Sequence, residues 1–577
     1  MHRAKYYLRR LRIWQWLLGG FVVFVLVMTS FVSMSLGQLS DLGLLRLTGF
    51  PGGQDYLVVF QNDAERRPTG GFISAYATLK FRFGMPLISF GNVYDERLIQ
   101  KGTQFPDSIV QDLIGGPQYP GHGFRDGNAD PDWPTSAKEL MRLYQLGYPD
   151  AAFDGVIAID FTAFAGLVDA VGSIRVGEQT FAGDTLFAQM EQEIQTIDLH
   201  NPAELAARKG ILGQLAKGLI RNLIFSPGKL NDITDSLVAS LASKHVLFYF
   251  TDTEMQARTL ARDWAGELPF VTAGDMLAVV EGNYGGMKSS RYLLRSTNYD
   301  VRLTDTADGS FAARAELDIA VEHRGDAAEP ISGYYKGYWR VFAPLGSQLI
   351  SGRHDVTFDD GTRQVFGRVI EMNPAEERDI SLKYDLPDSA VKDGVYHLRL
   401  VKQPGSAADH IRVTVKAPAG YLFASDQFDI RENLAVFETN LAEDTELALE
   451  IVPDTVPPGL AWQEFRGGVG ATGLRQIDLR FGEPLDSASV AGASFRMADL
   501  DYRNDRTDSI SVQRAEFIAP QNIRLYISGI REECREWYAL TIDGVADLHG
   551  NAIDERTVTV VQSLNNAGQL CDPEREL

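Results

Sequence analysis

Apolar and polar positions follow two different rhythms along the chain, and each rhythm predicts a different kind of fold. In 44–285, short apolar runs typical of strands occur between segments whose apolar residues recur every three or four positions, as in a helix. Mixed strands and helices are typical of a layered α/β domain, which we expect here. The strand-like runs include YLVVF, FISAYATLKF and HVLFYF, and the helix-like ones TSAKELMRLYQLGYP and PAELAARKGILGQLAKGLIRNLI.

From residue 286 the rhythm changes to alternating apolar and polar residues with frequent turns, as in GYWRVFAPLGSQLISG. This pattern predicts an all-β sandwich over 286–453. The stretch VPDTVPPG then has three prolines within six residues, which is typical of a semi-rigid linker. After it, the same alternation predicts a second, smaller β-sandwich over 454–577.

The N-terminus predicts a membrane anchor. Five basic residues crowd 1–12, and no charged residue occurs from Ile13 to Ser40. About 20 apolar residues in a helix span a hydrocarbon core of roughly 30 Å, so we expect a transmembrane helix at 13–36. Because basic flanks stay in the cytoplasm, the tail at 1–12 should be cytoplasmic and the bulk of the chain extracytoplasmic. A cleaved signal peptide is the alternative, although no A-x-A-like cleavage site is visible.

Charge and cysteine content narrow the classes of function. The chain has 55 Lys and Arg against 77 Asp and Glu, a formal net charge of −22. This acidic balance argues against a nucleic-acid partner, and an anionic wall polymer would need a local basic cluster or a divalent cation. The two cysteines, Cys534 and Cys571, predict a disulfide in an oxidising exterior, with two free thiols as the alternative. The chain has no zincin, nucleophile-elbow or P-loop motif, so familiar hydrolase or kinase chemistry is not indicated.

One segment between two apolar runs carries unusual charge. Residues 63–71, DAERRPTGG, which we call the charged loop, contain two acids, two arginines and a glycine pair. The segment is either a binding site or a long turn with solvated charges. Gly70 and Gly71 either present backbone N–H groups to an anion or serve turn geometry only.

A second polar segment has oxygen-bearing side chains at alternate positions. FRDGNADPDWP contains Asp126, Asn128, Asp130 and Asp132. This spacing is found in calcium-binding loops, but the downstream Glu of an EF-hand is missing. A structural acidic loop is therefore the alternative.

Four ordered motifs carry a family resemblance. The chain resembles the bacterial membrane-anchored family called domain of unknown function 4012 over about 44–453, and that family has no settled activity. The motifs are YLVVFQNDAERRPTGGFISAYATL, FDGVIAIDFTAFAGLVDAVGSIRV, DMLAVVEGNYGGMKSSRYLLR and YWRVFAPLGSQL. Within 454–577, VPPGLAWQEF and DLHGN resemble bacterial Ig-like modules of surface-layer proteins, which implies an Ig-like β-sandwich.

The order of strand, charged loop, strand and NVYD more distantly resembles the LytR-CpsA-Psr phosphotransferases. Those enzymes move glycopolymers from polyprenyl-pyrophosphate carriers onto the cell wall, with acids that hold a divalent cation and arginines that grip the pyrophosphate. The resemblance implies a LytR-CpsA-Psr-like α/β domain with Asp63 and Asp95 as ligands of Mg²⁺ or another divalent cation. Tyr94 and the glycine pair stand where that family has an arginine and an acid. The pyrophosphate site would comprise Asp63, Arg66, Arg67, Gly70, Gly71, Asp95, Asn128 and Arg208.

Three functions are compatible with these patterns. One is a non-catalytic envelope protein that binds a glycan or a protein partner during surface-polysaccharide or cell-wall processes. Another is a cation-dependent phosphotransferase or pyrophosphatase acting on a polyprenyl-pyrophosphate-linked glycan. The third is a biosynthetic accessory that escorts a polymer or its synthase.

Overall fold

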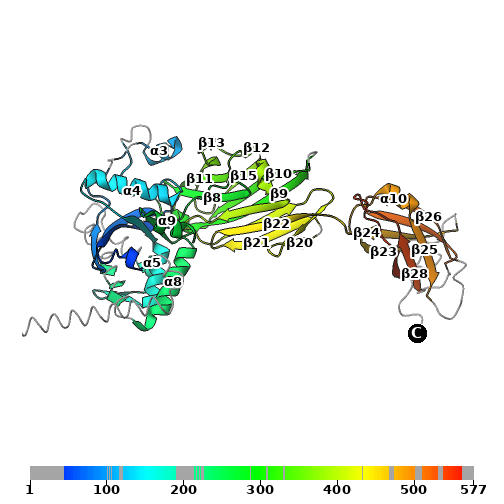
Figure 1. The fold of residues 1–577 in the computed structure, drawn as a ribbon, viewed down its shortest axis with the longest axis horizontal. Helices are drawn as coiled ribbons and strands as arrows, with labels where there is room; N and C mark the ends of the chain where they lie inside the picture. The colour runs from blue at the N-terminus through cyan, green and yellow to red at the C-terminus, as the bar shows by residue number, and fades with distance from the viewer. Residues whose placement is uncertain are drawn as a thin grey trace, which may run out of the picture. The chain divides into compact units, whose positions relative to one another are not determined.

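The computed structural model describes residues 44–561 apart from 100–101, 103, 106, 116–120, 190–213, 216–217, 220, 223–226, 286, 307–308, 329–331, 432, 467–472, 501–509 and 531–536. The chain divides into two compact units (Figure 1). The first comprises the chain up to Lys416 together with Ser425–Asp429 and Ala435–Leu449. The second comprises Ala417–Ala424, Ile430–Leu434 and the chain from Glu450 onward.

The first unit contains a five-stranded mixed sheet in the order β3-β2-β1-β4-β7. Only β1 and β4 pair in parallel, and the other neighbours are antiparallel. The short strands β5 and β6 form a separate hairpin. The bounds are β1 (Gly53–Asn62), β2 (Phe72–Arg82), β3 (Met85–Gly91), β4 (Gly155–Asp160), β5 (Ile174–Val176), β6 (Gln179–Phe181) and β7 (Val246–Phe250).

Helices cover both faces of this sheet. Helix α4 begins where the Asp132 carboxylate accepts the Thr135 N–H, and its apolar stripe, including Leu140, packs on one face. Residues of α5, α8 and α9 pack on the other face (Figure 1). The bounds are α2 (Leu44–Leu47), α3 (Ser108–Ile114), α4 (Trp133–Gly147), α5 (Phe161–Val171), α8 (Leu230–Ala242) and α9 (Thr253–Leu260).

Two larger sheets complete the first unit. One has the order β12-β15-β10-β9-β18-β21, and the other has the order β13-β14-β11-β8-β17-β22. Tyr299 of β9 donates a hydrogen bond to Asp275 of β8, so the sheets face each other. The bounds are β8 (Asp275–Asn283), β9 (Leu293–Asp305), β10 (Phe311–His323), β11 (Tyr335–Pro344), β12 (Gln348–Gly352), β13 (Val356–Asp359), β14 (Arg363–Met372), β15 (Glu377–Asp385), β16 (Val391–Lys392), β17 (Val395–Val401), β18 (Asp409–Lys416), β20 (Asp429–Arg431), β21 (Leu434–Leu441) and β22 (Thr445–Pro453).

The second unit has its own hydrophobic core. Its sheets have the orders β23-β24-β27-β26 and β25-β28-β29, and residues such as Ile477, Leu525 and Leu540 fill the core. The bounds are β19 (Tyr421–Ala424), β23 (Leu460–Arg466), β24 (Arg475–Phe481), α10 (Ser487–Gly492), β25 (Ser494–Asp499), β26 (Ser511–Ala519), β27 (Asn522–Ser528), β28 (Trp537–Asp543) and β29 (Arg556–Val561).

The fold class expected from the sequence, which rests on a layered α/β domain, is wrong. The described residues are mostly strand with few helices, and no helix among them is long and apolar enough to cross a membrane. The apolar runs in 53–91 form β1, β2 and β3, which pair antiparallel in succession rather than alternating with helices, and a tight turn at Phe83 and Gly84 joins β2 to β3. The helix expected at 13–36 lies outside the described residues.

Candidate functional site

The charged loop joins β1 to β2 and is folded tightly on itself. The Gly71 N–H donates to Gln61 Oε1 at 2.8 Å, and the Gly70 N–H donates to the Arg67 carbonyl at 3.0 Å. Gly70 has a φ of +132°, and a Cβ at this position would lie 2.2 Å from Gln61 Oε1. The position therefore requires glycine, and both glycine N–H groups are bonded to neighbouring residues, one in the loop and one at the end of β1.

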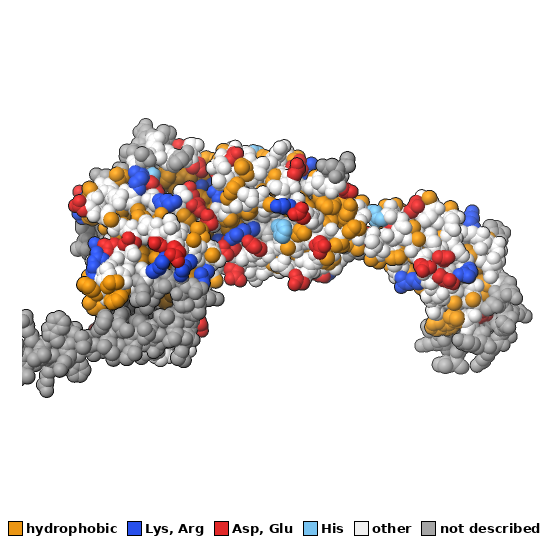
Figure 2. All heavy atoms as spheres, in the orientation of Figure 1, with side chains coloured by type: hydrophobic (Ala, Val, Ile, Leu, Met, Phe, Trp, Pro, Cys, Tyr) orange, Lys and Arg blue, Asp and Glu red, His pale blue; other side chains and the backbone are white. Residues whose placement is uncertain are grey.

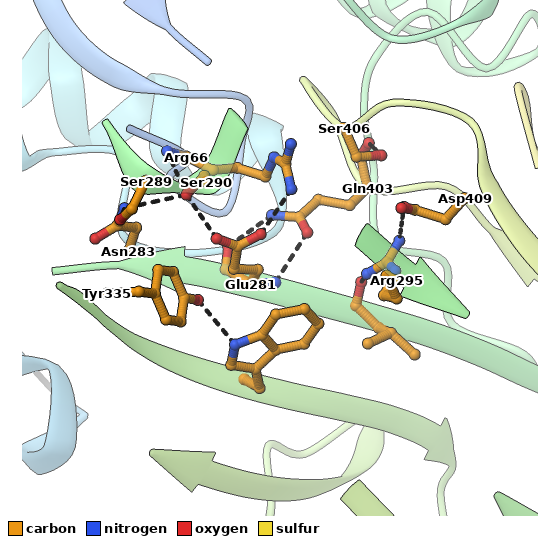
Figure 3. A network of polar contacts seen from close by, with 12 residues as sticks. Arg66, Glu281, Asn283, Ser289, Ser290, Arg295, Tyr335, Gln403, Ser406 and Asp409 are labelled. Carbon is orange, nitrogen blue, oxygen red and sulfur yellow. Dashed lines mark hydrogen bonds and ion pairs between the residues drawn. The ribbon is translucent and has the colours of Figure 1, made fainter. Parts of the chain in front are cut away.

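Arg66 of the charged loop reaches into a buried polar network (Figure 3). Its Nη1 donates to Glu281 Oε2 at 2.6 Å, and Ser290 Oγ donates to Glu281 Oε1 at 2.6 Å. The Glu281 side chain is fully buried and that of Arg66 is 10% exposed. Burial opposes the charge of Arg66, but the Glu281 carboxylate more than offsets it and raises the pKa of Arg66 above its usual value. Arg66 of the charged loop thus forms a buried ion pair with Glu281 of β8.

Further hydrogen bonds connect the same elements. The side-chain amide of Gln403 donates to the Glu281 carbonyl at 2.6 Å and accepts the Glu281 N–H at 2.9 Å. The Asn283 N–H donates to the Arg66 carbonyl at 2.8 Å, and the Asn283 side chain donates to Ser290 Oγ at 3.1 Å. Figure 3 shows Arg66 and Gln403 directed toward Glu281. The charged loop and β8 are therefore joined by both side-chain and backbone bonds.

Arg67 lies between two aromatic rings rather than in an open cleft. Its guanidinium is 4.7 Å from the ring centroid of Tyr284 and 5.4 Å from that of Phe72. Its Nη2 lies 3.3 Å from Glu65 Oε1. Burial raises the pKa of Glu65, and Arg67 opposes this rise. The Nε and Nη1 atoms of Arg67 are buried and have no hydrogen-bond partner among the described residues.

Asn128 also supports the charged loop. Its side-chain amide donates to Thr69 Oγ1 at 3.1 Å and to the Gly71 carbonyl at 2.9 Å, and it is fully buried. Of the other residues in the expected calcium loop, Asp130 accepts the Asp132 N–H at 2.8 Å, and Asp132 caps α4. Asp126 pairs with Arg125 at 3.4 Å. The carboxylates of Asp126, Asp130 and Asp132 are thus engaged within the protein, whereas Asn128 Oδ1 is buried and has no hydrogen-bond partner among the described residues.

Asp95 belongs to a separate cluster. Arg97 donates to both of its carboxylate oxygens, at 3.0 and 2.7 Å, and the Tyr148 hydroxyl donates to it at 2.8 Å. Hydrogen bonds from Arg97 hold the pKa of Asp95 well below its usual range. The groups found for metal binding among the described residues place Asp63 with Asp160 and His245, and not with Asp95. Arg208, Cys534 and Cys571 lie outside the described residues, so their roles stay predictions.

The network partners of the charged loop were not identified from the sequence. Glu281 stands in DMLAVVEGN, a strand that carries Asp275, Glu281 and Asn283 beside apolar residues, and acids in such an apolar run were the signal available. His245 directly precedes VLFYF, and Gln403 follows β17. Residues 403 and 281 are 122 positions apart, a separation at which periodicity predicts no contact.

The comparisons with known proteins give one family match and no activity. Residues 51–194 match the family described as "Protein of unknown function (DUF4012)", which supports the resemblance seen in the sequence. No curated protein matches the chain. The transcriptional regulator yvhJ from Bacillus subtilis is 12% identical over 40% of this chain and 86% of its own, with a TM-score of 0.22. The Lin1025 protein from Listeria innocua is 14% identical over 39% and 86%, with a TM-score of 0.20. These low TM-scores do not establish a common fold, and the LytR-CpsA-Psr resemblance stays a prediction.

Proposed function

We propose that this chain is a membrane-anchored, exported protein of the cell envelope that binds or helps to assemble a surface polysaccharide or cell-wall polymer without catalysing its transfer. The observation that carries the proposal is the buried ion pair between Arg66 and Glu281. A phosphotransferase needs guanidinium groups free to hold a pyrophosphate, whereas Arg66 is committed to Glu281 in a buried pair. In this account the charged loop is part of a fixed support for a binding surface.

Two surface features support an envelope role. The β2–β3 hairpin exposes large apolar side chains at its tip, with Phe83 65% and Leu87 59% exposed. Phe50 is also exposed and lies next to the turn, since a Cβ on Gly84 would be 3.7 Å from its ring. Phe50 lies 14 positions after the end of the expected anchor at 13–36, so this apolar hairpin is suited to the membrane side. Figure 2 shows acidic and basic side chains interspersed on the viewed face of the described residues, as expected for a surface without a nucleic-acid partner.

The proposal is tested by binding. The full chain in lipid nanodiscs is presented to purified wall polysaccharide, with an uncharged dextran as the control, and association is followed by biolayer interferometry. We expect saturable binding to the wall polymer and recovery of the polymer unchanged. Absence of binding to either the polymer or an envelope-protein extract would contradict the proposal.

The expected topology has its own test. Protease added outside intact cells should degrade the chain beyond residue 44 while the tail at 1–12 stays protected. Full protection of the chain would contradict an exported protein.

The second candidate function is the cation-dependent phosphotransferase or pyrophosphatase. The observation that favours it is Arg67, whose Nε and Nη1 atoms have no partner among the described residues and so could serve an anion. This function requires turnover of a polyprenyl-pyrophosphate-linked glycan that is lost in Arg67→Ala. If the chain is such an enzyme, the wild-type protein forms product. If it is a non-catalytic binding protein, the wild-type protein forms none.

A further inference from the structure

The sheet topology gathers three metal-binding side chains at one edge of the five-stranded sheet. Strands β1 and β4 run parallel with Gln61 opposite Asp160, so Asp63 leaves β1 at the edge where β4 ends. Strand β7 runs antiparallel to β4 with Val246 opposite Ile159, which brings His245 to the same edge. The Asp160 N–H donates to the His245 carbonyl at 3.0 Å. The backbone register alone thus places Asp63, Asp160 and His245 together.

The side chains converge as closely as the backbone predicts. One ligand atom of each residue lies within 4.8 Å of the corresponding atoms of the other two. His245 Nδ1 is 2.5 Å from Asp160 Oδ2, and Asp160 Oδ1 accepts the Ala163 N–H at 2.9 Å. Asp63 Oδ2 accepts the Thr162 N–H at 3.3 Å and the Thr162 hydroxyl. Both carboxylates are more than nine-tenths buried.

One oxygen of this cluster has no bonding partner. Asp63 Oδ1 is buried and accepts no hydrogen bond from any described residue. A buried acceptor left unsatisfied costs about 1–3 kcal/mol, and more when the group is charged. The first turn of α5 donates to the other oxygen of Asp63, so the helix N-terminus does not account for Oδ1. A group that supplies positive charge at this point would satisfy it.

The charge balance at the cluster favours a cation. Asp63 and Asp160 are both buried carboxylates of the same three-residue cluster. Two carboxylates in a buried position repel each other unless a proton or a cation lies between them.

We propose that Asp63, Asp160 and His245 bind a divalent cation of the first transition row, such as Zn²⁺ or Mn²⁺. An imidazole nitrogen with carboxylate oxygens is a donor set that these ions accept, whereas Mg²⁺ and Ca²⁺ favour oxygen ligands alone. The site differs from the pair Asp63 and Asp95 expected from the sequence, because Arg97 and Tyr148 already occupy Asp95. The site does not depend on the proposed binding role of the chain.

The test measures metal binding by the full chain in detergent after chelator treatment. Isothermal titration with Zn²⁺ and with Mn²⁺ should show one equivalent bound per chain at this site. Asp63→Asn and His245→Gln keep side-chain size and should each weaken that binding at least 10-fold. Asp160→Asn is not used because Asp160 caps α5.

The matched control is Asp454→Asn, which alters a second acidic group formed by Asp454, Glu483 and Asp547. It should leave the binding isotherm unchanged. X-ray absorption of the zinc-loaded wild-type chain should show imidazole scattering that is lost in His245→Gln. No bound metal in the wild-type chain would overturn the proposal, as would binding that survives Asp63→Asn and His245→Gln or that is lost instead in Asp454→Asn or Asp95→Asn.

Discussion

Removing Glu281 is the most informative perturbation of the joint between the charged loop and β8. Glu281→Ala deletes the acceptor of Arg66 Nη1 and of Ser290 Oγ, both of which lie 2.6 Å from the carboxylate. The Arg66 Nε atom is already without a partner among the described residues. The variant would therefore leave a guanidinium buried at 10% exposure without the carboxylate that pairs with it, so that only the more distant charges of Asp409 and Asp63 offset its burial.

The size of the effect follows from that burial. Removing one member of a buried pair costs about 3–5 kcal/mol, because the remaining charge is uncompensated. A free-energy loss of about 3 kcal/mol accelerates local opening on the order of 100-fold. Replacing both residues by methionine leaves no buried charge, so Arg66→Met with Glu281→Met should cost about 2–3 kcal/mol less than the sum of the single changes.

Hydrogen exchange of the full chain, followed by mass spectrometry, reports opening of the segments concerned. Peptides that contain β8 and residues 63–72 should exchange much faster in Glu281→Ala. The control is Glu316→Ala, which removes an exposed pair with Lys383 and should change stability by less than about 1 kcal/mol. Exchange in Glu281→Ala that matches the control, or strictly additive effects in the double variant, would refute the reasoning.

Three further predictions concern the same unit. Gly70→Ala should lower the free energy of unfolding by about 3 kcal/mol through backbone strain and a clash with Gln61. The control Gly177→Ala, which has open space around it, should lower that free energy by about 1 kcal/mol. Equal losses of the two variants in urea unfolding would contradict this prediction. Asn128→Ala should cost about 1–3 kcal/mol and speed exchange in residues 69–71, and unchanged exchange would show that its two hydrogen bonds do not hold the loop. Burial, opposed by two tyrosine hydroxyls, raises the pKa of Asp275 to about 6, above an unfolded value of about 3.9. The folded state therefore binds this proton more tightly, so unfolding free energy should fall by about 3 kcal/mol as pH rises from 4 to above 6. Asp275→Asn should flatten that decline, and an identical pH profile would contradict the assignment.

Local signals in the sequence predicted individual elements well. The segment TSAKELMRLYQLGYP was expected to be a helix, and α4 spans Trp133–Gly147 because a carboxylate cap and an apolar stripe agree there. The run YLVVF lies within β1, where it is mostly buried. These features depend on residues within a few positions of one another, which periodicity and capping describe.

The assembly of those elements could not be predicted in the same way. Arg66 meets Glu281 across 215 positions, and Asp160 meets His245 across 85. Such contacts depend on strand order and register, since a shift of one residue in β7 would turn His245 to the other face. The expectation that Asp63 and Asp95 share a site did not take account of Arg97, which lies two positions from Asp95 and donates hydrogen bonds to its carboxylate.

The fold class was wrong for a related reason. The pattern in 44–285 predicted strands that alternate with helices. Most of the described strands instead pair antiparallel, either with the next strand in the sequence or within the two large sheets.

Turnover is the measurement that tests the central claim most directly. The full chain in nanodiscs is incubated with a radiolabelled polyprenyl-pyrophosphate-linked glycan, an acceptor wall polymer and Mg²⁺, Mn²⁺ or Zn²⁺ in turn, and the label on acceptor and released phosphate is counted. If the chain is a non-catalytic binding protein with Arg66 paired to Glu281, we expect label bound to the chain. We expect no transfer of label and no phosphate release above a protein-free control. Transfer or phosphate release that depends on the cation and disappears in Arg67→Ala would contradict it.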